Sequence, residues 1–351
     1  MYHIRRVIRL LFAVAVAVLA GLSLSSAADP TPRLVTEHFT IDAPDPGIKL
    51  YIRNKRPEAM TQFTAEKTLL FVHGATQPAE ATFDLPLEGV SWMDYIASRG
   101  WDVYLVDVRG YGTSSRPPEM DQPAANNSPV ATTDVAIRDV KSAIDFILQR
   151  RSVSKINLMG WSWGTVIMAA YAVDHPDKVE RLVLYGPTWL RTSPAPQGAS
   201  RPLGAYIETQ MARARERLQA GAPEDRKEAL MPASWFEAWS TAVLATDPLG
   251  SKQNPPVLRS PAGVFQDVRN YWEAGKPYYD PSKINAPTLV IVAEWDYCVP
   301  DAQALFQKLR NRFEKRLVQI GEGTHVVMLE KNRMQLFEEV QFFLDRARLT
   351  N

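Results

Sequence analysis

The sequence has a single cysteine and almost no excess of charge of either sign. Cys298 alone cannot form an intrachain disulfide, which excludes a fold held together by disulfide bonds. The 40 Lys and Arg residues face 39 Asp and Glu, so no basic surplus is available to neutralise phosphates and we expect no nucleic-acid partner. With 351 residues, 46% of them hydrophobic and 23% charged, the composition excludes collagen-like and wholly disordered chains.

Long apolar runs are also absent, except at the N-terminus. Arginines there precede an apolar run over residues 10–20, and a stretch of small residues then ends at Ala28. This order is typical of a signal peptide, so we expect cleavage of residues 1–28 and export to the periplasm or the medium. The run is shorter than the ~20 apolar residues that span a bilayer, and we expect no membrane span in the mature protein.

Past this segment, short apolar runs alternate with helical patterns. Two alternating stretches before residue 54 are typical of a hairpin. The apolar runs cover residues 68–72, 103–106, 156–159, 182–184 and 288–292, and the helical patterns cover residues 133–149, 165–173 and 302–311. Such alternation predicts an α/β fold, with a mostly parallel sheet between two layers of helices.

The alternation stops between residues 187 and 283, where proline, charged and aromatic residues are frequent. We therefore predict a core built from residues 29–186 and 284–351, with an inserted helical cap over residues 187–283. Within the cap, residues 205–220 contain helix formers and a charged face, which predicts a solvated helix.

The sequence Gly160-Trp-Ser162-Trp-Gly164 lies directly between a buried strand pattern and a helical pattern. In this context G-x-S-x-G predicts a tight turn that presents the serine as a nucleophile. Both glycines are needed because side chains two residues before and after the serine would collide. The start of the following helix then favours negative charge near Ser162.

A serine hydroxyl needs an adjacent base, and elimination among the histidines favours His325. His3 lies in the signal segment and His38 in the hairpin. His73 follows a strand in a turn suited to oxyanion binding, and His175 ends the helix after the nucleophile. His325 remains, in a loop between an apolar stretch and an amphipathic terminal helix, where a base can reach the serine.

The carboxylate that orients the base should come between serine and histidine in the chain. Asp296 follows the run over residues 288–293 and fits this place. Glu294 is nearer the strand end, and Asp301 is explained by the start of a helix. A tetrahedral intermediate also needs two backbone donors. We expect them at Trp163 and at Ala75, with Thr76 as the alternative to Ala75.

Together these motifs resemble the serine hydrolases of the α/β-hydrolase superfamily that carry a cap domain. The matching pieces are His73-Gly74-Ala75, residues 107–114, 160–164 and 175–184, Asp296 to Pro300, and Gly323-Thr-His325. The resemblance implies Ser162, Asp296 and His325 as a catalytic triad, Ala75 and Trp163 as the oxyanion pair, and the cap as a lid. It also implies that Asp107 and Arg109 have structural roles.

The nucleophile turn is also similar to that of proline iminopeptidases, which carry a tryptophan after the serine. Those enzymes have His-Gly-Gly-Pro-Gly where this chain has His73-Gly-Ala-Thr-Gln77. Haloalkane dehalogenases and epoxide hydrolases of this fold use an aspartate nucleophile, which Ser162 excludes. An aminopeptidase or amidase and a C–C bond hydrolase remain alternatives, as does a ligand-binding receptor, although a receptor needs none of the triad geometry.

Aromatic residues are frequent around the predicted nucleophile and in the predicted cap. The predicted pocket residues are Trp161, His73, Trp189, Trp235, Trp239, Trp272 and Trp295. Such a pocket suits a small apolar or aromatic ester. Cys298 is expected to be a buried small hydrophobic residue. We thus expect hydrolysis of a carboxylic ester or lactone through an acyl-enzyme, with neither a metal ion nor an organic cofactor.

Overall fold

The computed structural model describes residues 32–190, 202–299, 301–310 and 314–347. The predicted signal peptide and residues 191–201 of the predicted cap lie outside this part of the chain. No helix in the described residues combines the length and the apolar character that crossing a membrane requires.

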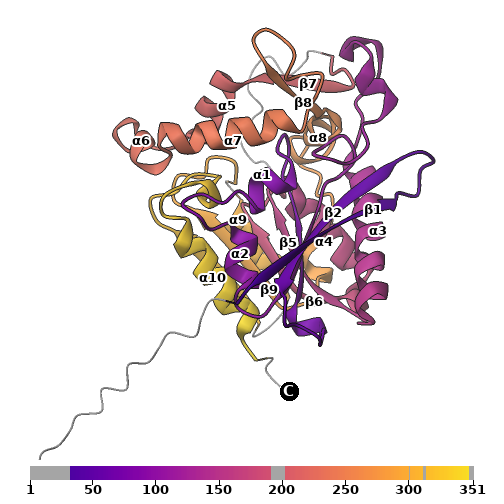
Figure 1. The fold of residues 1–351 in the computed structure, drawn as a ribbon, viewed down its shortest axis with the longest axis vertical. Helices are drawn as coiled ribbons and strands as arrows, with labels where there is room; N and C mark the ends of the chain where they lie inside the picture. The colour runs from indigo at the N-terminus through magenta and orange to yellow at the C-terminus, as the bar shows by residue number, and fades with distance from the viewer. Residues whose placement is uncertain (1–31, 191–201, 300, 311–313, 348–351) are drawn as a thin grey trace, which may run out of the picture. The chain divides into compact units, whose positions relative to one another are not determined.

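An eight-stranded, mostly parallel sheet forms the centre of the fold (Figure 1), which confirms the predicted class. Its order is β1-β2-β4-β3-β5-β6-β9-β10, and only the pairs β1–β2 and β2–β4 are antiparallel. The strands are β1 (Leu34–Asp42), β2 (Lys49–Pro57), β3 (Thr68–Val72), β4 (Asp102–Val106), β5 (Ile156–Trp161), β6 (Val179–Tyr185), β9 (Thr288–Ala293) and β10 (Lys315–Ile320). All five predicted apolar runs are strands, and β1 and β2 form the predicted hairpin.

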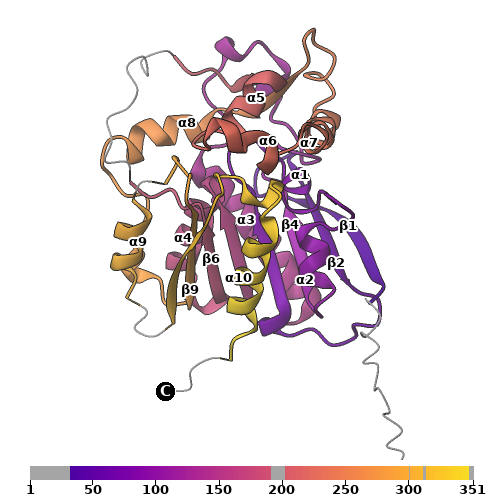
Figure 2. The same cartoon turned by 90° about the vertical axis from the view of Figure 1, so that its left-hand side faces the viewer.

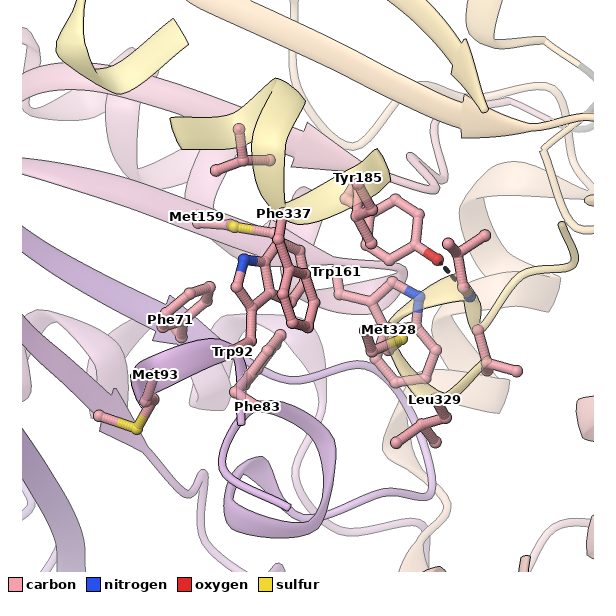
Figure 3. Packing of buried hydrophobic residues seen from close by; sticks show 14 of the residues in the cluster. Phe71, Phe83, Trp92, Met93, Met159, Trp161, Tyr185, Met328, Leu329 and Phe337 are labelled. Atoms are coloured by element: carbon pink, nitrogen blue, oxygen red, sulfur yellow. Dashed lines mark hydrogen bonds between the residues drawn. The ribbon is translucent and has the colours of Figure 1, made fainter. Parts of the chain in front are cut away.

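Helices cover both faces of this sheet, which explains why the central strands β3 and β6 are buried at every position and mostly apolar. In β3, Leu69 and Phe71 belong to one buried cluster and Leu70 and Val72 to the other. The first cluster includes α2 (Trp92–Ala97) and α10 (Arg333–Asp345); the second includes α3 (Thr133–Arg151), α4 (Trp163–Asp174) and α9 (Ala302–Lys308). The first cluster is rich in stacked rings (Figure 3).

The segment between β6 and β9 contributes no described strand to the large sheet. Its elements gather beyond one end of that sheet in both views (Figures 1 and 2). They are β7 (Tyr206–Gln210), α5 (Met211–Leu218), α6 (Lys227–Leu230), α7 (Ala233–Ala245), β8 (Val257–Pro261), α8 (Gly263–Asp267) and the π-helical turn η6 (Val268–Trp272).

Residues 205–220 differ from the predicted single helix. The first part is β7, which pairs antiparallel with β8, and the helix begins only at Met211. Tyr206, Ile207 and Thr209 are aromatic or β-branched residues that favour a strand, and pairing with β8 stabilises that conformation. The segment therefore contains a two-stranded sheet as well as helices.

Short turns complete the described chain. They are α1 (Ala79–Phe83) and the 3₁₀ turns η1 (Ala65–Lys67), η2 (Pro118–Asp121), η3 (Ala124–Asn126), η4 (Pro176–Lys178), η5 (Glu224–Arg226), η7 (Pro281–Lys283) and η8 (Val327–Leu329).

Candidate active site

Ser162 lies in the tight turn that joins β5 to α4. Its φ of 53° and ψ of −120° lie in a region that costs a non-glycine residue about 1–3 kcal/mol. Its amide donates a 2.9 Å hydrogen bond to the carbonyl oxygen of Tyr185, which helps to hold this conformation. A Cβ at Gly160 would lie 2.2 Å from the carbonyl oxygen of Gly164, and a Cβ at Gly164 would lie 2.4 Å from that of Val72. Both glycines are therefore needed for the turn.

His325 and Asp296 meet at the carboxyl edge of the sheet. The His325 Nδ1–H donates to Asp296 Oδ2 over 2.8 Å. The Asp296 side chain is fully buried, and its second oxygen accepts a 2.9 Å hydrogen bond from the amide of Cys298. The carboxylate thus fixes the imidazole tautomer and leaves Nε2 available as a base.

Two aromatic side chains hold the loop that carries His325. The Tyr185 hydroxyl donates to the His325 carbonyl oxygen over 3.0 Å and accepts from the Val327 amide over 2.9 Å. The Trp161 indole donates to the same carbonyl over 2.9 Å. Figure 3 shows Tyr185 and Trp161 beside the segment that contains Met328 and Leu329. The end of β6 and the nucleophile turn therefore both position the histidine.

A buried carboxyl group supports the same loop from behind. Glu330 accepts hydrogen bonds from the Thr324 hydroxyl at 2.5 Å and from the Thr324 amide at 3.2 Å. Burial raises the pKa of Glu330 to about 7, despite the hydrogen bonds from Thr324, and the nearby Asp296 charge adds to the rise. The Thr324 hydroxyl oxygen also lies 2.9 Å from the Leu218 carbonyl oxygen of α5, so the histidine loop contacts the cap segment here.

The turn after β3 brings Ala75 to the cavity that Ser162 also lines. A Cβ at Gly74 would lie 2.9 Å from the Ser162 Cβ, so this close approach needs glycine. Thr76 has a φ of 66°, and its hydroxyl donates to the Ala75 carbonyl oxygen over 2.6 Å. The turn thus carries the backbone amides that we expect to face an oxyanion.

His73 braces this turn from inside the protein. Its Nδ1–H donates to the Gly74 carbonyl over 2.8 Å, and its Nε2 accepts from the Val108 amide over 3.1 Å. Burial lowers the pKa of His73 to about 4, so the ring is neutral near pH 7. The side chain is fully buried and does not reach the cavity, which corrects its prediction as a pocket residue.

One cavity contains Ser162 and His325 together. Apolar groups form much of its wall. Besides Ser162 and His325, polar side chains reach the cavity from the turn after β3, from α5 and from the loop after β9. The lining residues are Ala75, Thr76, Gln77, Trp161, Ser162, Arg217, Leu218, Phe265, Tyr297, Cys298, His325 and Val326.

Of the predicted tryptophans, only Trp161 lines this cavity. Trp189, Trp235, Trp239 and Trp272 are buried in the two hydrophobic clusters, where they join helices to one another and to the sheet. Trp295 follows β9 but is also absent from the lining. These five tryptophans were predicted to line the pocket, and the structure places them outside the cavity lining. An aromatic side chain indicates burial, but it does not indicate whether the ring packs against protein or against a substrate.

Trp163 occupies the position after Ser162 and begins α4. Its ring packs in the second cluster, and its indole donates to the Thr133 hydroxyl over 2.9 Å. Only its backbone amide is therefore a candidate for the site, and its role as an oxyanion donor stays a prediction.

Several lining residues were not predicted. Arg217 reaches the cavity from α5, Gln77 from the turn after β3, and Phe265 from α8. Cys298 is partly exposed there, which corrects the prediction that it is a buried hydrophobic residue. The sequence does not predict these contacts, because they join segments that are far apart in the chain: Arg217 and its hydrogen-bond partner Thr76 are separated by 141 residues.

The ligand atoms of Asp296, Cys298 and His325 lie within 4.8 Å of one another, close enough to hold a metal ion. In this structure, however, the His325 Nδ1–H donates a hydrogen bond to the Asp296 carboxylate. A metal at that nitrogen would have to replace this hydrogen bond.

Asp107 and Arg109 stabilise loops away from the cavity. Asp107 accepts hydrogen bonds from the amides of Ala79 and Thr113, at 2.8 and 3.1 Å. The Arg109 guanidinium pairs with the buried Asp139 at 2.5 Å. These contacts are structural.

Comparison with known proteins identifies the family. A family model described as the alpha/beta hydrolase fold matches residues 67–332. Epoxide hydrolase 3 of Siraitia grosvenorii is 26% identical over 162 residues, which are 45% of this chain. The chain spans only 41% of the length of that relative.

Solved structures of low identity share the fold. A hydrolase from Pseudomonas aeruginosa is similar with a TM-score of 0.60 and 19% identity, over 88% of this chain and 99% of that chain. An esterase from Thermogutta terrifontis has a TM-score of 0.54 and 18% identity, over 88% and 98%. Because the family model covers most of its length, the chain belongs to the α/β-hydrolase family.

Proposed function

We propose that this protein is a hydrolase that cleaves carboxylic esters or lactones through an acyl-enzyme on Ser162. The observation that carries the proposal is that one cavity holds a serine in a strained turn and a histidine whose Nδ1–H binds a buried carboxylate. This combination activates a hydroxyl nucleophile and has no purpose in passive ligand binding.

In the proposed reaction, His325 Nε2 takes the proton of Ser162 Oγ as this oxygen attacks the ester carbonyl. Asp296 stabilises the imidazolium that forms. The carbonyl oxygen becomes an oxyanion, which accepts hydrogen bonds from the backbone amides of Trp163 and Ala75. The C–O bond then breaks, and His325 returns the proton to the leaving alkoxide. His325 then deprotonates a water molecule, which attacks the carbonyl carbon of the acyl-enzyme. The bond between that carbon and Ser162 Oγ breaks, His325 returns the proton to Oγ, and the carboxylic acid leaves.

The charges in the cavity favour an ester over an aminopeptidase substrate. An aminopeptidase has to bind a protonated amino group, for which a carboxylate is the natural partner. No Asp or Glu side chain is among the described lining residues, and the permanent charge there is the cation of Arg217. An epoxide hydrolase of this fold would need a carboxylate nucleophile, whereas this chain has Ser162 at that position.

We also propose that the protein is exported. The basis is the order of basic, apolar and small residues before Asp29. The active protein would then begin close to β1 and act outside the cytoplasm on a small-molecule substrate.

The proposal is tested with 4-nitrophenyl esters of increasing acyl length, with proline 4-nitroanilide and with a vinylogous 1,5-diketone that reports C–C cleavage. Wild type should cleave the esters, and Ser162→Ala should be inactive. Thr209→Ala, in the surface strand β7, is the control variant. Cleavage of the anilide or the diketone without the esters would overturn the proposal.

A further inference from the structure

Arg217 places a positive charge beside the candidate nucleophile. It lies in the last turn of α5, and its side chain lines the cavity together with Ser162 and His325. Its guanidinium donates a hydrogen bond to the hydroxyl of Thr76, in the turn that carries Ala75. The cation therefore lies close to where the acyl group or the alcohol group of an ester would bind.

Within the described residues, no carboxylate forms an ion pair with this cation. Arginines whose side chains are more deeply buried than that of the partly buried Arg217 do have such partners: Arg109 pairs with Asp139, Arg151 with Asp102 and Arg259 with Asp247, at 2.5–2.7 Å. Burial lowers the pKa of Arg217, and the groups that act against this are only Tyr297, Cys298 and Tyr111. A shielded cation without a counterion is costly unless a ligand supplies one.

Gln77 adds an unpaired acceptor to the same cavity. The residue is only 2% exposed, and its side-chain oxygen Oε1 has no hydrogen-bond partner among the described residues. It follows Thr76 in the chain and lines the cavity beside it. Buried polar groups are normally hydrogen-bonded, so this oxygen indicates that a ligand places a donor, such as a hydroxyl or an amide N–H, near Gln77.

We propose that Arg217 forms a subsite that binds a carboxylate on the ester substrate. The guanidinium would hold the carboxylate through charge-assisted hydrogen bonds. The rest of the wall, including Trp161, Leu218 and Phe265, accommodates an apolar body. The substrate is thus a half-ester of an apolar dicarboxylic acid, or an ester or lactone with a carboxylate elsewhere in the molecule. This inference rests on the proposed function and names the substrate class for it.

A purely structural role for Arg217 makes a different prediction. The contact with Thr76 joins α5 to the turn that carries Ala75, so Arg217 could serve only to fasten these two segments. Loss of such a fastening would slow charged and neutral esters alike. Loss of a carboxylate subsite would change the ratio between them.

The test compares esters that differ only in charge. The first pair is the mono-4-nitrophenyl ester of adipic acid, which carries a free acid on the acyl side, and the neutral diester in which this acid is methylated. The second pair, 4-acetoxybenzoate and its methyl ester, carries it on the alcohol side. We expect wild type to have a kcat/KM at least about 10-fold higher for the acid in one pair. Arg217→Gln should bring that ratio close to one, and Arg217→Lys should keep part of the preference.

Arg213→Gln is the matched control, since Arg213 lies in the same helix, is exposed and pairs with Glu216. It should leave the ratio unchanged. A wild-type ratio near one in both pairs, or an equal loss on both members in Arg217→Gln, would overturn the subsite.

A binding measurement separates this inference from the proposed function. Titration calorimetry of Ser162→Ala with monomethyl adipate and dimethyl adipate needs no turnover. Tighter binding of the monoacid, lost in the Ser162→Ala, Arg217→Gln double variant, would support the subsite even if wild type cleaved no ester and the proposed function failed. Equal binding of both compounds would overturn the subsite even if esters were cleaved.

Discussion

Gly186 lies directly against His325: a Cβ at residue 186 would be 2.9 Å from Cε1 of the imidazole and 3.0 Å from its Nδ1. Gly186 follows β6 with a φ of +56°, and its amide donates to the Ile291 carbonyl oxygen over 2.8 Å. The residue after β6 therefore leaves the space in which the histidine and its carboxylate meet.

Gly186→Ala should impair catalysis by displacing the imidazole. We expect kcat for an ester to fall by about 100-fold, because small displacements of a catalytic group cost this much. Gly275→Ala is the control, since Gly275 has a similar φ of +68° but no atom within 4 Å of its added Cβ. Both variants carry comparable backbone strain, so an equal loss of kcat in the two would contradict a specific contact with His325.

Tyr185→Phe should loosen the histidine loop. The substitution removes the hydroxyl that links the His325 carbonyl to the Val327 amide and leaves both groups buried without this partner. We expect a loss of about 1–3 kcal/mol in the free energy of unfolding and a fall in kcat of about 10-fold.

The control for Tyr185 is Tyr279→Phe, because the Tyr279 hydroxyl is buried and has no hydrogen-bond partner in the part of the chain that the structure describes. Removing it should leave the free energy of unfolding unchanged or higher. Urea unfolding measures the free energy of unfolding of both variants, and ester hydrolysis measures their kcat. Similar losses of stability and kcat in the two variants would contradict the role of Tyr185 in holding the histidine loop.

Glu330 should make stability fall as the pH rises. Its folded pKa of about 7 lies above the ordinary value of 4.5, so the folded state holds a proton that the unfolded state loses first. The stabilisation is complete below about pH 4.5 and disappears as the pH passes 7, with a total of about 3 kcal/mol.

Glu330→Gln keeps the shape of this side chain but cannot ionise. Urea unfolding between pH 5 and 8 should show a smaller decline in the variant than in wild type. Asp107, whose pKa burial raises to about 6, contributes the same background to both proteins. Parallel pH profiles would contradict a buried, protonated Glu330.

Export can be tested at the level of the chain. Expression of the full sequence in a Gram-negative host should yield a periplasmic or secreted protein that begins after Ala27 or Ala28. Cell fractionation and mass spectrometry of the N-terminal peptide measure this. A cytoplasmic product that retains Met1 would refute the signal peptide.

The strands and the candidate triad could be predicted from the sequence because their signals are local. The apolar run before Gly160 and the two glycines around Ser162 determine the turn by themselves. His325 and Asp296 follow from chain order and from the rule that loops at the carboxyl edge of a parallel sheet converge. The structure indeed joins these two side chains by a 2.8 Å hydrogen bond.

The wall of the cavity could not be predicted in the same way. The apolar character of Trp235 and Trp239 indicates burial, but the same burial is achieved in a hydrophobic cluster and against a substrate. Arg217 lies in a stretch of alternating charges that is typical of a solvated helix face, and only the fold turns it toward Thr76. Which residues meet at the cavity depends on contacts between segments far apart in the chain.

If Ser162 is the nucleophile that becomes acylated, a reagent that forms a stable bond with an activated serine should label it. Wild type, Ser162→Ala and Cys298→Ser would be treated with a fluorophosphonate and analysed by intact and peptide mass spectrometry. We expect one adduct per chain, on Ser162, in wild type and in Cys298→Ser, and none in Ser162→Ala. Labelling of Cys298, which lines the same cavity, or a wild-type protein that stays unlabelled while it cleaves esters, would contradict this role of Ser162.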